Sequence, residues 1–318
     1  MEEFLVKPVC FTYFQKNQLK VLDVSLGDSH ILTVAKQKDG TETEMGDIYS
    51  WGLDLYGRLG FNPLKFENIY DLIMAKEVKY EIIRIPIKLN LPEKISRVCC
   101  GPDYSSCLTI SGKIYTWGFN KYGNLGLGDT LKNDNNFDLN NYDEKKNNKD
   151  KKSDYNSVKS KKPENNLFNQ DEELFEENEM FVKYPQIVKG LIDKKIIQIS
   201  CGNKHMLVLS EERRAYSWGC GDFGVLGISS FESVSYPVLI KSLSKEDLVF
   251  VACGETTSAA INSFGSVYSW GSGKYGKLGN GTYSDYNFPF KIDDPTLNNQ
   301  KIFYISLGPY HTVCASCK

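Results

Sequence analysis

The chain has 318 residues, with 38 basic and 40 acidic side chains and a formal net charge of −2. A charge this small excludes a global basic field that would draw the protein onto nucleic acid or a membrane. No apolar run approaches the roughly 18 residues of a membrane helix. The nine cysteines follow no signal peptide, so we expect an intracellular protein in a reducing compartment, in the cytoplasm or the nucleus.

A short phrase, Tyr-x-Trp-Gly, occurs four times along the chain. Each copy is followed by a second phrase, an aromatic residue and then Gly-x-Leu-Gly. Recurrence at this scale predicts one supersecondary unit repeated several times. The Trp-Gly pairs are Trp51-Gly52, Trp117-Gly118, Trp218-Gly219 and Trp270-Gly271.

A third shared element, Gly-x-x-His or a variant of it, precedes each Trp-Gly. A fifth copy near the C-terminus has no Trp-Gly after it. The spacing from this glycine to the tryptophan is longer in the first unit, where residues 36–46 read as a lengthened hairpin loop. The glycines are Gly27, Gly101, Gly202, Gly254 and Gly308, and the histidines are His30, His205 and His311.

The pattern within each unit predicts strands. Apolar residues alternate at period two, as in Ile197-Gln198-Ile199, which favours a strand with one buried face. The Tyr and Trp of Tyr-x-Trp share a face of a pleated strand, and we expect the fixed glycines to end each strand. A proline strand is predicted to open each unit, with its proline at Pro8, Pro86, Pro185, Pro237 and Pro289.

Two inserts interrupt the repeats. Residues 131–180 are rich in Asn, Lys, Asp and Glu and contain no glycine, so they bury too little apolar surface to offset their ordering entropy and are predicted to be disordered. Residues 62–80 are compatible with a short amphipathic helix that packs on the repeats or docks a partner. Repeats 1 and 2 then occupy residues 1–130, and repeats 3, 4 and a partial fifth occupy residues 181–318.

These phrases resemble the repeat of the regulator of chromosome condensation family, most closely over residues 98–129 and 251–282. The resemblance implies an all-β protein, a β-propeller with four-stranded blades, in which the signature residues are mostly structural. The family usually closes a ring of seven blades, whereas four complete repeats and a partial fifth are present here. A smaller ring, completion by another copy and a longer gene product all remain open.

No catalytic residue, cofactor or metal ion is predicted. The three histidines hold one repeat position, so we expect each to make a structural hydrogen bond at a strand start, which leaves none for a nucleophile–base pair. The cysteines before the signature glycine exchange with leucine, which indicates a buried apolar position. They are Cys100, Cys201 and Cys253.

Two further motifs are interpreted as coincidences of spacing. Cys314 and Cys317 have C-x-x-C spacing but lack the additional ligands of a structural zinc site. The glycines at positions 271, 273 and 276 match a phosphate-binding pattern, which requires a following helix that the sequence does not predict.

The sequence therefore favours a non-enzymatic module that binds another protein. The family resemblance implies an alternative, guanine nucleotide exchange on a Ran-type small GTPase, which needs a shaped surface rather than a catalytic triad. A third hypothesis, attachment to nucleic acid or chromatin, depends only on the lysine block at residues 145–162.

Overall fold

The computed structural model describes residues 11–38, 44–61, 81–128, 181–294 and 300–317. The predictions made for residues 62–80, for residues 131–180 and for the lysine block lie outside these ranges. Within them, no helix is long and apolar enough to cross a membrane.

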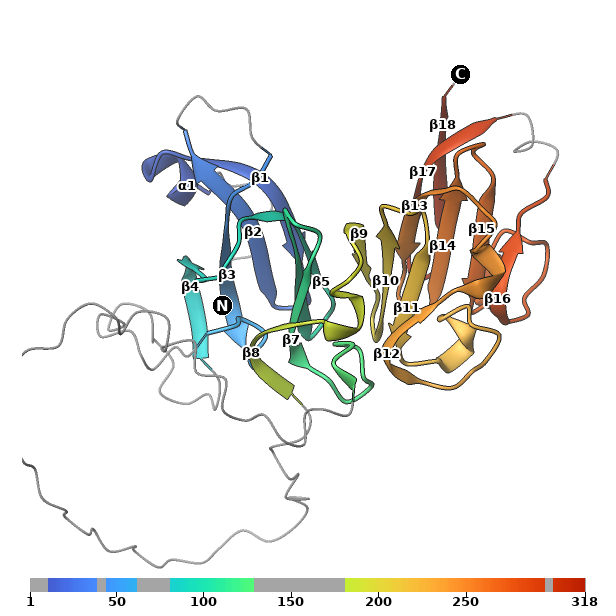
Figure 1. Ribbon diagram of the computed structural model, residues 1–318, viewed down its shortest axis with the longest axis horizontal. Coiled ribbons are helices and arrows are strands. Elements are labelled where there is room, and N and C mark those ends of the chain that lie inside the picture. The colour runs from blue at the N-terminus through green and yellow to red at the C-terminus, as the bar shows by residue number, and fades with distance from the viewer. Residues whose placement is uncertain (1–10, 39–43, 62–80, 129–180, 295–299, 318) are drawn as a thin grey trace, which may run out of the picture. The chain divides into compact units, whose positions relative to one another are not determined.

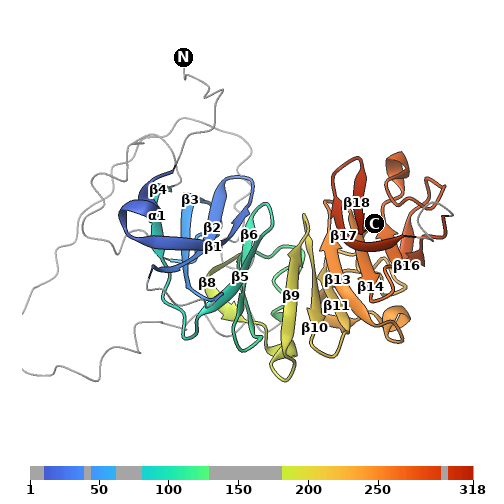
Figure 2. The same cartoon turned by 90° about the horizontal axis from the view of Figure 1, so that it is seen from above.

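Antiparallel sheets of four strands repeat along the chain, followed by a two-stranded sheet (Figures 1 and 2). We call them blades 1 to 5 in chain order. Blade 1 contains β1 (Leu19–Leu26), β2 (His30–Gln37), β3 (Asp47–Asp54) and β4 (Glu81–Lys88). Blade 2 contains β5 (Ile95–Cys100), β6 (Tyr104–Thr109), β7 (Ile114–Phe119) and β8 (Phe181–Ile187). Blade 3 contains β9 (Ile196–Cys201), β10 (His205–Ser210), β11 (Ala215–Gly219) and β12 (Val234–Leu239). Blade 4 contains β13 (Leu248–Cys253), β14 (Thr257–Asn262), β15 (Val267–Gly271) and β16 (Tyr286–Lys291), and blade 5 contains β17 (Lys301–Leu307) and β18 (Thr312–Cys317).

The prediction of an all-β fold with four-stranded blades is confirmed, but the predicted boundary of the unit is wrong. Each proline strand pairs with the Tyr-x-Trp-Gly strand of the unit before it and is the last strand of that blade. The edge position suits proline, which has no N–H to give to a further strand. Pro8 lies outside the described residues.

The glycine of Tyr-x-Trp-Gly has a different role from the one we predicted. In blade 1 the strand continues past Gly52 to Asp54, and the pairing of β3 with β4 shifts register between Ser50 and Gly52. The φ angle of Gly52 is +118°, a region that residues with a Cβ rarely adopt. The glycine therefore forms a bulge within the strand, and only in β11 and β15 is it the last strand residue.

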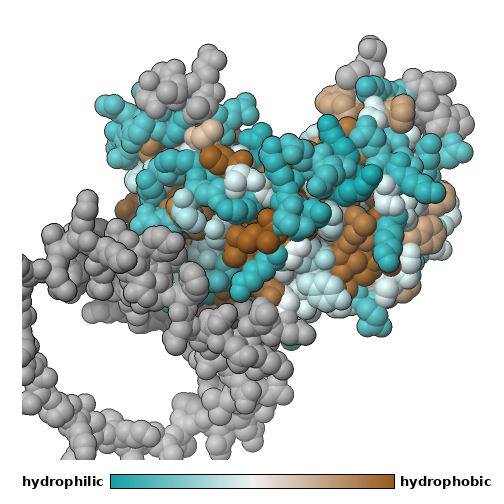
Figure 3. Space-filling view, viewed as in Figure 1, coloured by the Kyte–Doolittle hydropathy of each residue, from teal (hydrophilic) through white to brown (hydrophobic). Residues whose placement is uncertain are grey.

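The hydrophobic core lies between successive blades. One cluster joins Leu32 and Ile48 of blade 1 to Val98 and Trp117 of blade 2, and similar clusters join the later pairs. Each blade is therefore stabilised mainly by its neighbours, as in other repeat proteins. On the face seen in Figure 3, the apolar side chains left at the surface form separate patches between hydrophilic ones.

Helices are short in the described ranges. Four 3-10 turns lie between strands: η5 (Lys189–Leu191), η6 (Asp222–Gly224), η7 (Lys241–Leu243) and η8 (Lys274–Gly276). The α-helix α1 (Tyr13–Lys16) was not predicted. Its Phe14 and the preceding Phe11 place their rings 6.0 and 5.8 Å from the ring of Trp51, which is only half-buried.

Candidate functional site

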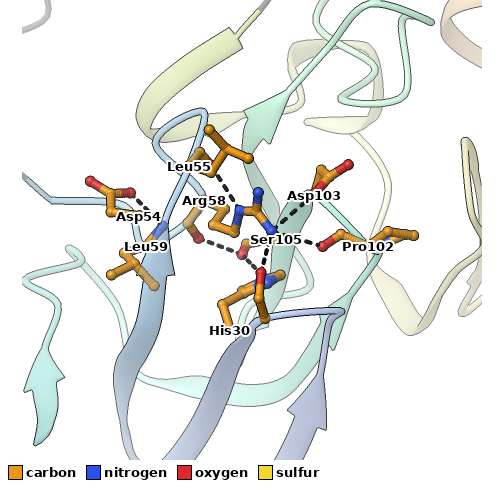
Figure 4. Close-up of polar contacts among 9 residues, drawn as sticks. His30, Asp54, Leu55, Arg58, Leu59, Pro102, Asp103 and Ser105 are labelled. Atoms are coloured by element: carbon orange, nitrogen blue, oxygen red, sulfur yellow. Dashed lines mark hydrogen bonds and ion pairs between the residues drawn. The ribbon is translucent and has the colours of Figure 1, made fainter. Parts of the chain in front are cut away.

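The signature histidines of blades 1 and 3 lie buried at the junction with the next blade. His30 Nε2 is 2.9 Å from Ser105 Oγ of blade 2, and Ser105 Oγ donates to the carbonyl of Arg58 at 2.7 Å (Figure 4). Because the single hydroxyl proton is used on that carbonyl, Ser105 accepts from His30, and Nε2 carries the imidazole proton. His205, Ser258 and the carbonyl of Val225 repeat this arrangement.

Burial keeps both rings neutral. Desolvation lowers the pKa of His30 to about 3, with a contribution from the nearby Arg58, and lowers the pKa of His205 to about 4. The signature glycine is needed because a Cβ at Gly27 or Gly202 would collide with the imidazole three residues later. Neither ring is placed to exchange protons with a substrate at neutral pH.

The tryptophans donate to the same carbonyls. Trp117 Nε1 lies 2.9 Å from the carbonyl of Arg58 in the preceding blade, and Trp270 Nε1 lies 2.8 Å from that of Val225. Trp218 Nε1 lies 3.0 Å from the carbonyl of Asn124. We call this carbonyl, which belongs to the variable residue of the aromatic-Gly-x-Leu-Gly phrase, the junction carbonyl. It joins each turn to the next blade.

The side chain of Arg58 adds a second connection at the first junction. It is fully buried, and it donates from Nε to the carbonyl of Leu55 at 2.8 Å. Its Nη1 donates to Ser29 Oγ at 2.8 Å and forms an ion pair with Asp103 at 3.0 Å (Figure 4). The guanidinium thus connects turns of blades 1 and 2. Lys277 does the same between blades 4 and 5, donating to Thr256 Oγ1 and to the carbonyl of Pro309.

The remaining signature positions vary. Tyr104 replaces histidine in blade 2, and its hydroxyl donates toward the carbonyls of Gly202 and His205. Gly101 and Gly254 hold the signature-glycine position in blades 2 and 4, and Gly308 holds it in blade 5. His311 of blade 5 is exposed, in contrast to His30 and His205. The structure therefore brings the signature residues together in pairs at junctions and gathers them into no single active site.

The cysteines before the signature glycine are hydrogen-bonded at the junctions. Cys100 Sγ lies 3.4 Å from the carbonyl of Ser25, and Cys253 Sγ lies 3.2 Å from that of Ser200. Burial raises the pKa of both thiols, so they stay protonated and are poor nucleophiles. Burial raises the pKa of the Cys201 thiol as well. Cys314, in β18, is half-buried.

Of the two short motifs, the C-x-x-C lies in β18 and the glycine motif begins at the end of β15. Across the described ranges, no three His, Cys, Asp or Glu side chains come together to hold a metal ion. The glycines at 271, 273 and 276 lead from β15 through a 3-10 turn into β16, without the helix that a phosphate loop needs. A cavity of about 290 Å³ lies between blades 4 and 5, and its lining includes the apolar Val267, Ile292 and Ile302 and the polar Ser266, Lys291 and Asp293.

One end of the blades exposes aromatic side chains. The turn before the second strand and the turn after the third strand lie at the same end of each sheet, because His30 pairs with Gly52 and the other blades follow this register. We call this end the loop face. Its aromatic residues include the exposed Tyr56, Phe223, Phe231, Tyr275, Tyr283 and Tyr310 and the half-buried Phe119 and Tyr122.

Three of these aromatic residues have strained backbones. Tyr56, Phe223 and Tyr275 have φ angles of +59°, +60° and +66°, and all three are exposed. A left-handed conformation costs a bulky residue about 1–3 kcal/mol. In blades 1 and 3 the glycine that follows the aromatic residue packs closely on the next blade, Gly57 on Lys183 and Gly224 on Asn287. That packing holds the turn in place and leaves the ring in solvent.

Aromatic contacts extend across the loop face. The rings of Tyr56 and Phe119 lie 4.7 Å apart, and those of Tyr275 and Tyr310 lie 5.2 Å apart. Lys204 Nζ is 4.3 Å from the ring of Tyr122. Sequence analysis assigned the aromatic position to the repeat only. The sequence did contain a signal for this exposure: an aromatic residue in a glycine-rich turn has few apolar neighbours to pack against, so its ring is expected at the surface.

The comparisons with known proteins agree with this architecture. A family model described as "Regulator of chromosome condensation (RCC1) repeat" matches residues 45–108, 111–138, 214–261 and 265–315. A second model with the same description matches residues 196–225. Together they match more than half of the chain.

Curated relatives are much longer than this chain. The human E3 ubiquitin-protein ligase HERC2 is 27% identical over 295 residues, which cover 90% of this chain and 5% of that protein. The ultraviolet-B receptor UVR8 of Arabidopsis thaliana is 28% identical over 294 residues, which cover 92% of this chain and 50% of that protein. The chain thus spans half or less of these two relatives.

Solved structures show the same fold. Yeast RCC1 (Prp20) bound to Kap60 aligns with a TM-score of 0.66 and 18% identity, over 95% of this chain and 55% of Prp20. Prp20 of Saccharomyces cerevisiae, in a structure reported with its binding properties to Gsp1p and histones, aligns with a TM-score of 0.64 and 19% identity, over 95% of this chain and 57% of Prp20.

Proposed function

Because this chain belongs to the regulator of chromosome condensation (RCC1) repeat family, we propose that it is a non-enzymatic module that binds another protein through its loop face. The observation that carries this proposal is the exposure of aromatic rings on strained turns at that face. Strain that leaves Phe223 and Tyr275 in solvent adds nothing to the core, so a binding role accounts for it better than folding does.

The chemistry of the loop face suits a protein partner. Exposed aromatic rings bury a large area at little entropic cost and are enriched at protein interfaces. Exposed charges of both signs lie between them: Asp28, Asp222 and Glu255 are negative, and Lys121 and Lys274 are positive. A surface of mixed sign does not suit a phosphate backbone, whose binding depends on clustered Lys and Arg.

A double variant tests this proposal. We expect Phe223→Ser with Tyr275→Ser to lose proteins that copurify with the wild-type chain, because the exposed anchors of the interface are removed. The measurement is affinity purification with quantitative mass spectrometry. The matched control is Phe264→Ser, since Phe264 is also exposed but lies in the β14–β15 turn at the opposite end of the sheet. Partners retained by the double variant, or lost equally by the control, would contradict the proposal.

Guanine nucleotide exchange on a Ran-type GTPase is the second candidate. It is favoured by the likeness to Prp20, whose structure was reported with its binding to Gsp1p. Exchange requires only a surface that distorts the nucleotide site of the GTPase, so the absence of a catalytic pair is compatible with it. We expect this chain at catalytic concentration to accelerate release of a fluorescent GDP analogue from the GTPase. An unchanged rate with folded protein would reject this candidate and leave the first proposal standing.

A further inference from the structure

One pair of positions recurs where the first strands of successive blades meet. Ser25 Oγ of β1 accepts from the backbone N–H of Cys100 in β5 at 2.9 Å. Ser200 Oγ of β9 accepts from the backbone N–H of Cys253 in β13, also at 2.9 Å. The strand registers place Cys99 of β5 at the same position as Ser25 and Ser200. We call this the serine position, and we call the position that donates to it the cysteine position.

The junction between blades 2 and 3 has a sulfur atom where its two neighbours have an oxygen. Cys99 Sγ accepts from the backbone N–H of Cys201 at 3.0 Å. In the junctions on either side, the thiol at the cysteine position has a serine hydroxyl as a hydrogen-bond partner. The thiol of Cys201 instead has the thiol of Cys99 as its partner. Two thiols from different blades therefore face each other at this junction.

The geometry of this cysteine pair suits a covalent link. Because a backbone N–Cα bond is about 1.46 Å long, the 3.0 Å contact places Cys99 Sγ within about 4.5 Å of Cys201 Cα. A sulfur so close to the backbone of its partner agrees with the dimensions of disulfides, whose Cα atoms are usually about 4.4–6.8 Å apart. Both cysteines are half-buried rather than enclosed, so a small oxidant can reach them.

We propose that Cys99 and Cys201 form a redox-sensitive pair, which a peroxide oxidises to a disulfide that joins blades 2 and 3. The thiolate of Cys99 attacks one oxygen of hydrogen peroxide and breaks the O–O bond. This gives a sulfenic acid and a hydroxide, which takes up a proton and leaves as water. The sulfur of Cys201 then attacks the sulfenic sulfur, whose oxygen leaves as a second water with the proton of Cys201. Two thiols and one peroxide thus give one disulfide and two waters.

The order of attack follows from the surroundings of the second sulfur. Burial raises the pKa of the Cys201 thiol, and its hydrogen bond with Cys99 raises it further. Cys201 therefore stays protonated and reacts second, which leaves Cys99 to meet the peroxide first.

The disulfide strengthens one junction selectively. At the other junctions between described blades, the serine position holds Ser25, Ser200 or Ala252, none of which can form a disulfide. The link from Cys99 to Cys201 closes a loop of about 100 residues and so lowers the entropy of the unfolded chain. Oxidation should therefore raise the resistance of the chain to urea, and a thiol reductant should reverse the gain.

Peptide mapping of the 318-residue chain tests the proposal. The chain is treated with hydrogen peroxide, unfolded, alkylated at its remaining thiols and digested without reductant. We expect mass spectrometry to find a peptide linked through Cys99 and Cys201, and urea unfolding to show a higher midpoint for the oxidised chain than for the reduced one. Cys99→Ser, which keeps the adjacent Cys100, should lose both effects. It should unfold like the reduced wild type, because serine holds this position in blades 1 and 3.

A variant at the next junction provides the matched control. Ser200→Cys rebuilds the thiol pair opposite Cys253, so peroxide should link that position to Cys253, whereas Ser200→Ala should form no second link. A wild-type chain with no peptide linked between Cys99 and Cys201 after peroxide treatment, whether Cys99 stays reduced or becomes a sulfinic acid, would overturn the proposal. So would an oxidised wild type whose urea midpoint equals that of the reduced chain.

Discussion

A buried neutral histidine at the blade junctions links stability to pH. His205 makes its hydrogen bond to Ser258 as a neutral donor, and burial lowers its pKa from 6.5 to about 4. The unfolded chain binds a proton at this residue below about pH 6.5, and the folded chain does so only near pH 4. Its contribution is therefore fully present above pH 6.5 and is lost as the pH falls toward 4.

We predict that His205→Gln flattens this dependence. Between pH 7 and pH 4 the wild type should lose about 3 kcal/mol more of its free energy of unfolding than the variant does, because the pKa of His205 is about 4 in the folded chain and 6.5 in the unfolded chain. Urea unfolding at a series of pH values measures the difference. Parallel curves for the wild type and His205→Gln would show that the ring titrates freely in the folded state.

In blades 1 to 3, the turn after the third strand contains a glycine that lies against the tryptophan of the next blade. A Cβ at Gly126 would lie 2.6 Å from Trp218 Nε1, and a Cβ at Gly227 would lie 2.6 Å from Trp270 Nε1. The last glycine of the repeated phrase is therefore needed for two reasons: the turn has a positive φ at this position, and the indole of the next blade leaves no space for a side chain. The same tryptophan needs the space to reach the junction carbonyl of Asn124.

Substitutions at two nearby glycines distinguish the cost of the positive φ from the cost of the clash with the indole. Gly126 and Gly128 both have a φ of +70°, but a Cβ at Gly128 meets nothing within 4 Å. Gly128→Ala should lower the free energy of unfolding by about 1–2 kcal/mol through backbone strain alone. Gly126→Ala should add about 1–3 kcal/mol from the clash with the indole of Trp218. Chemical denaturation of both variants measures this, and equal losses would mean that the indole moves aside freely.

At the scale of the whole molecule, most of the fold could be predicted because the repeated phrases record it locally. Period-two apolar alternation and recurring Tyr-x-Trp-Gly placed the strands and the blades. The proline strand was assigned to the wrong blade, because sequence order does not show which edge it pairs with. The helix α1 was missed because four residues are too few to show a 3.6-residue period.

The junction contacts were less predictable than the fold. The junction carbonyl is a backbone group, so its two donors, such as Ser105 and Trp117, leave no signature at the acceptor residue. The residues at that position are Arg58, Asn124, Val225 and Lys277. Because they differ so much, the sequence did not indicate that the side chains of Arg58 and Lys277 connect neighbouring blades. The loop face depends on φ angles and on packing between blades, which a single sequence does not reveal.

In blade 2 the proline strand lies far along the chain from the strand that it pairs with, and this affects the protein while the ribosome is making it. Within blade 2, β7 ends at Phe119 and its partner β8 begins at Phe181. At about 5–20 residues per second, a ribosome makes the intervening chain in roughly 3 to 12 seconds. During that interval the outer edge of β7 has emerged without its partner, and an unpaired edge is a template for pairing with other chains. The length of the insert therefore sets how long each nascent chain depends on chaperones or on low crowding to keep that edge free.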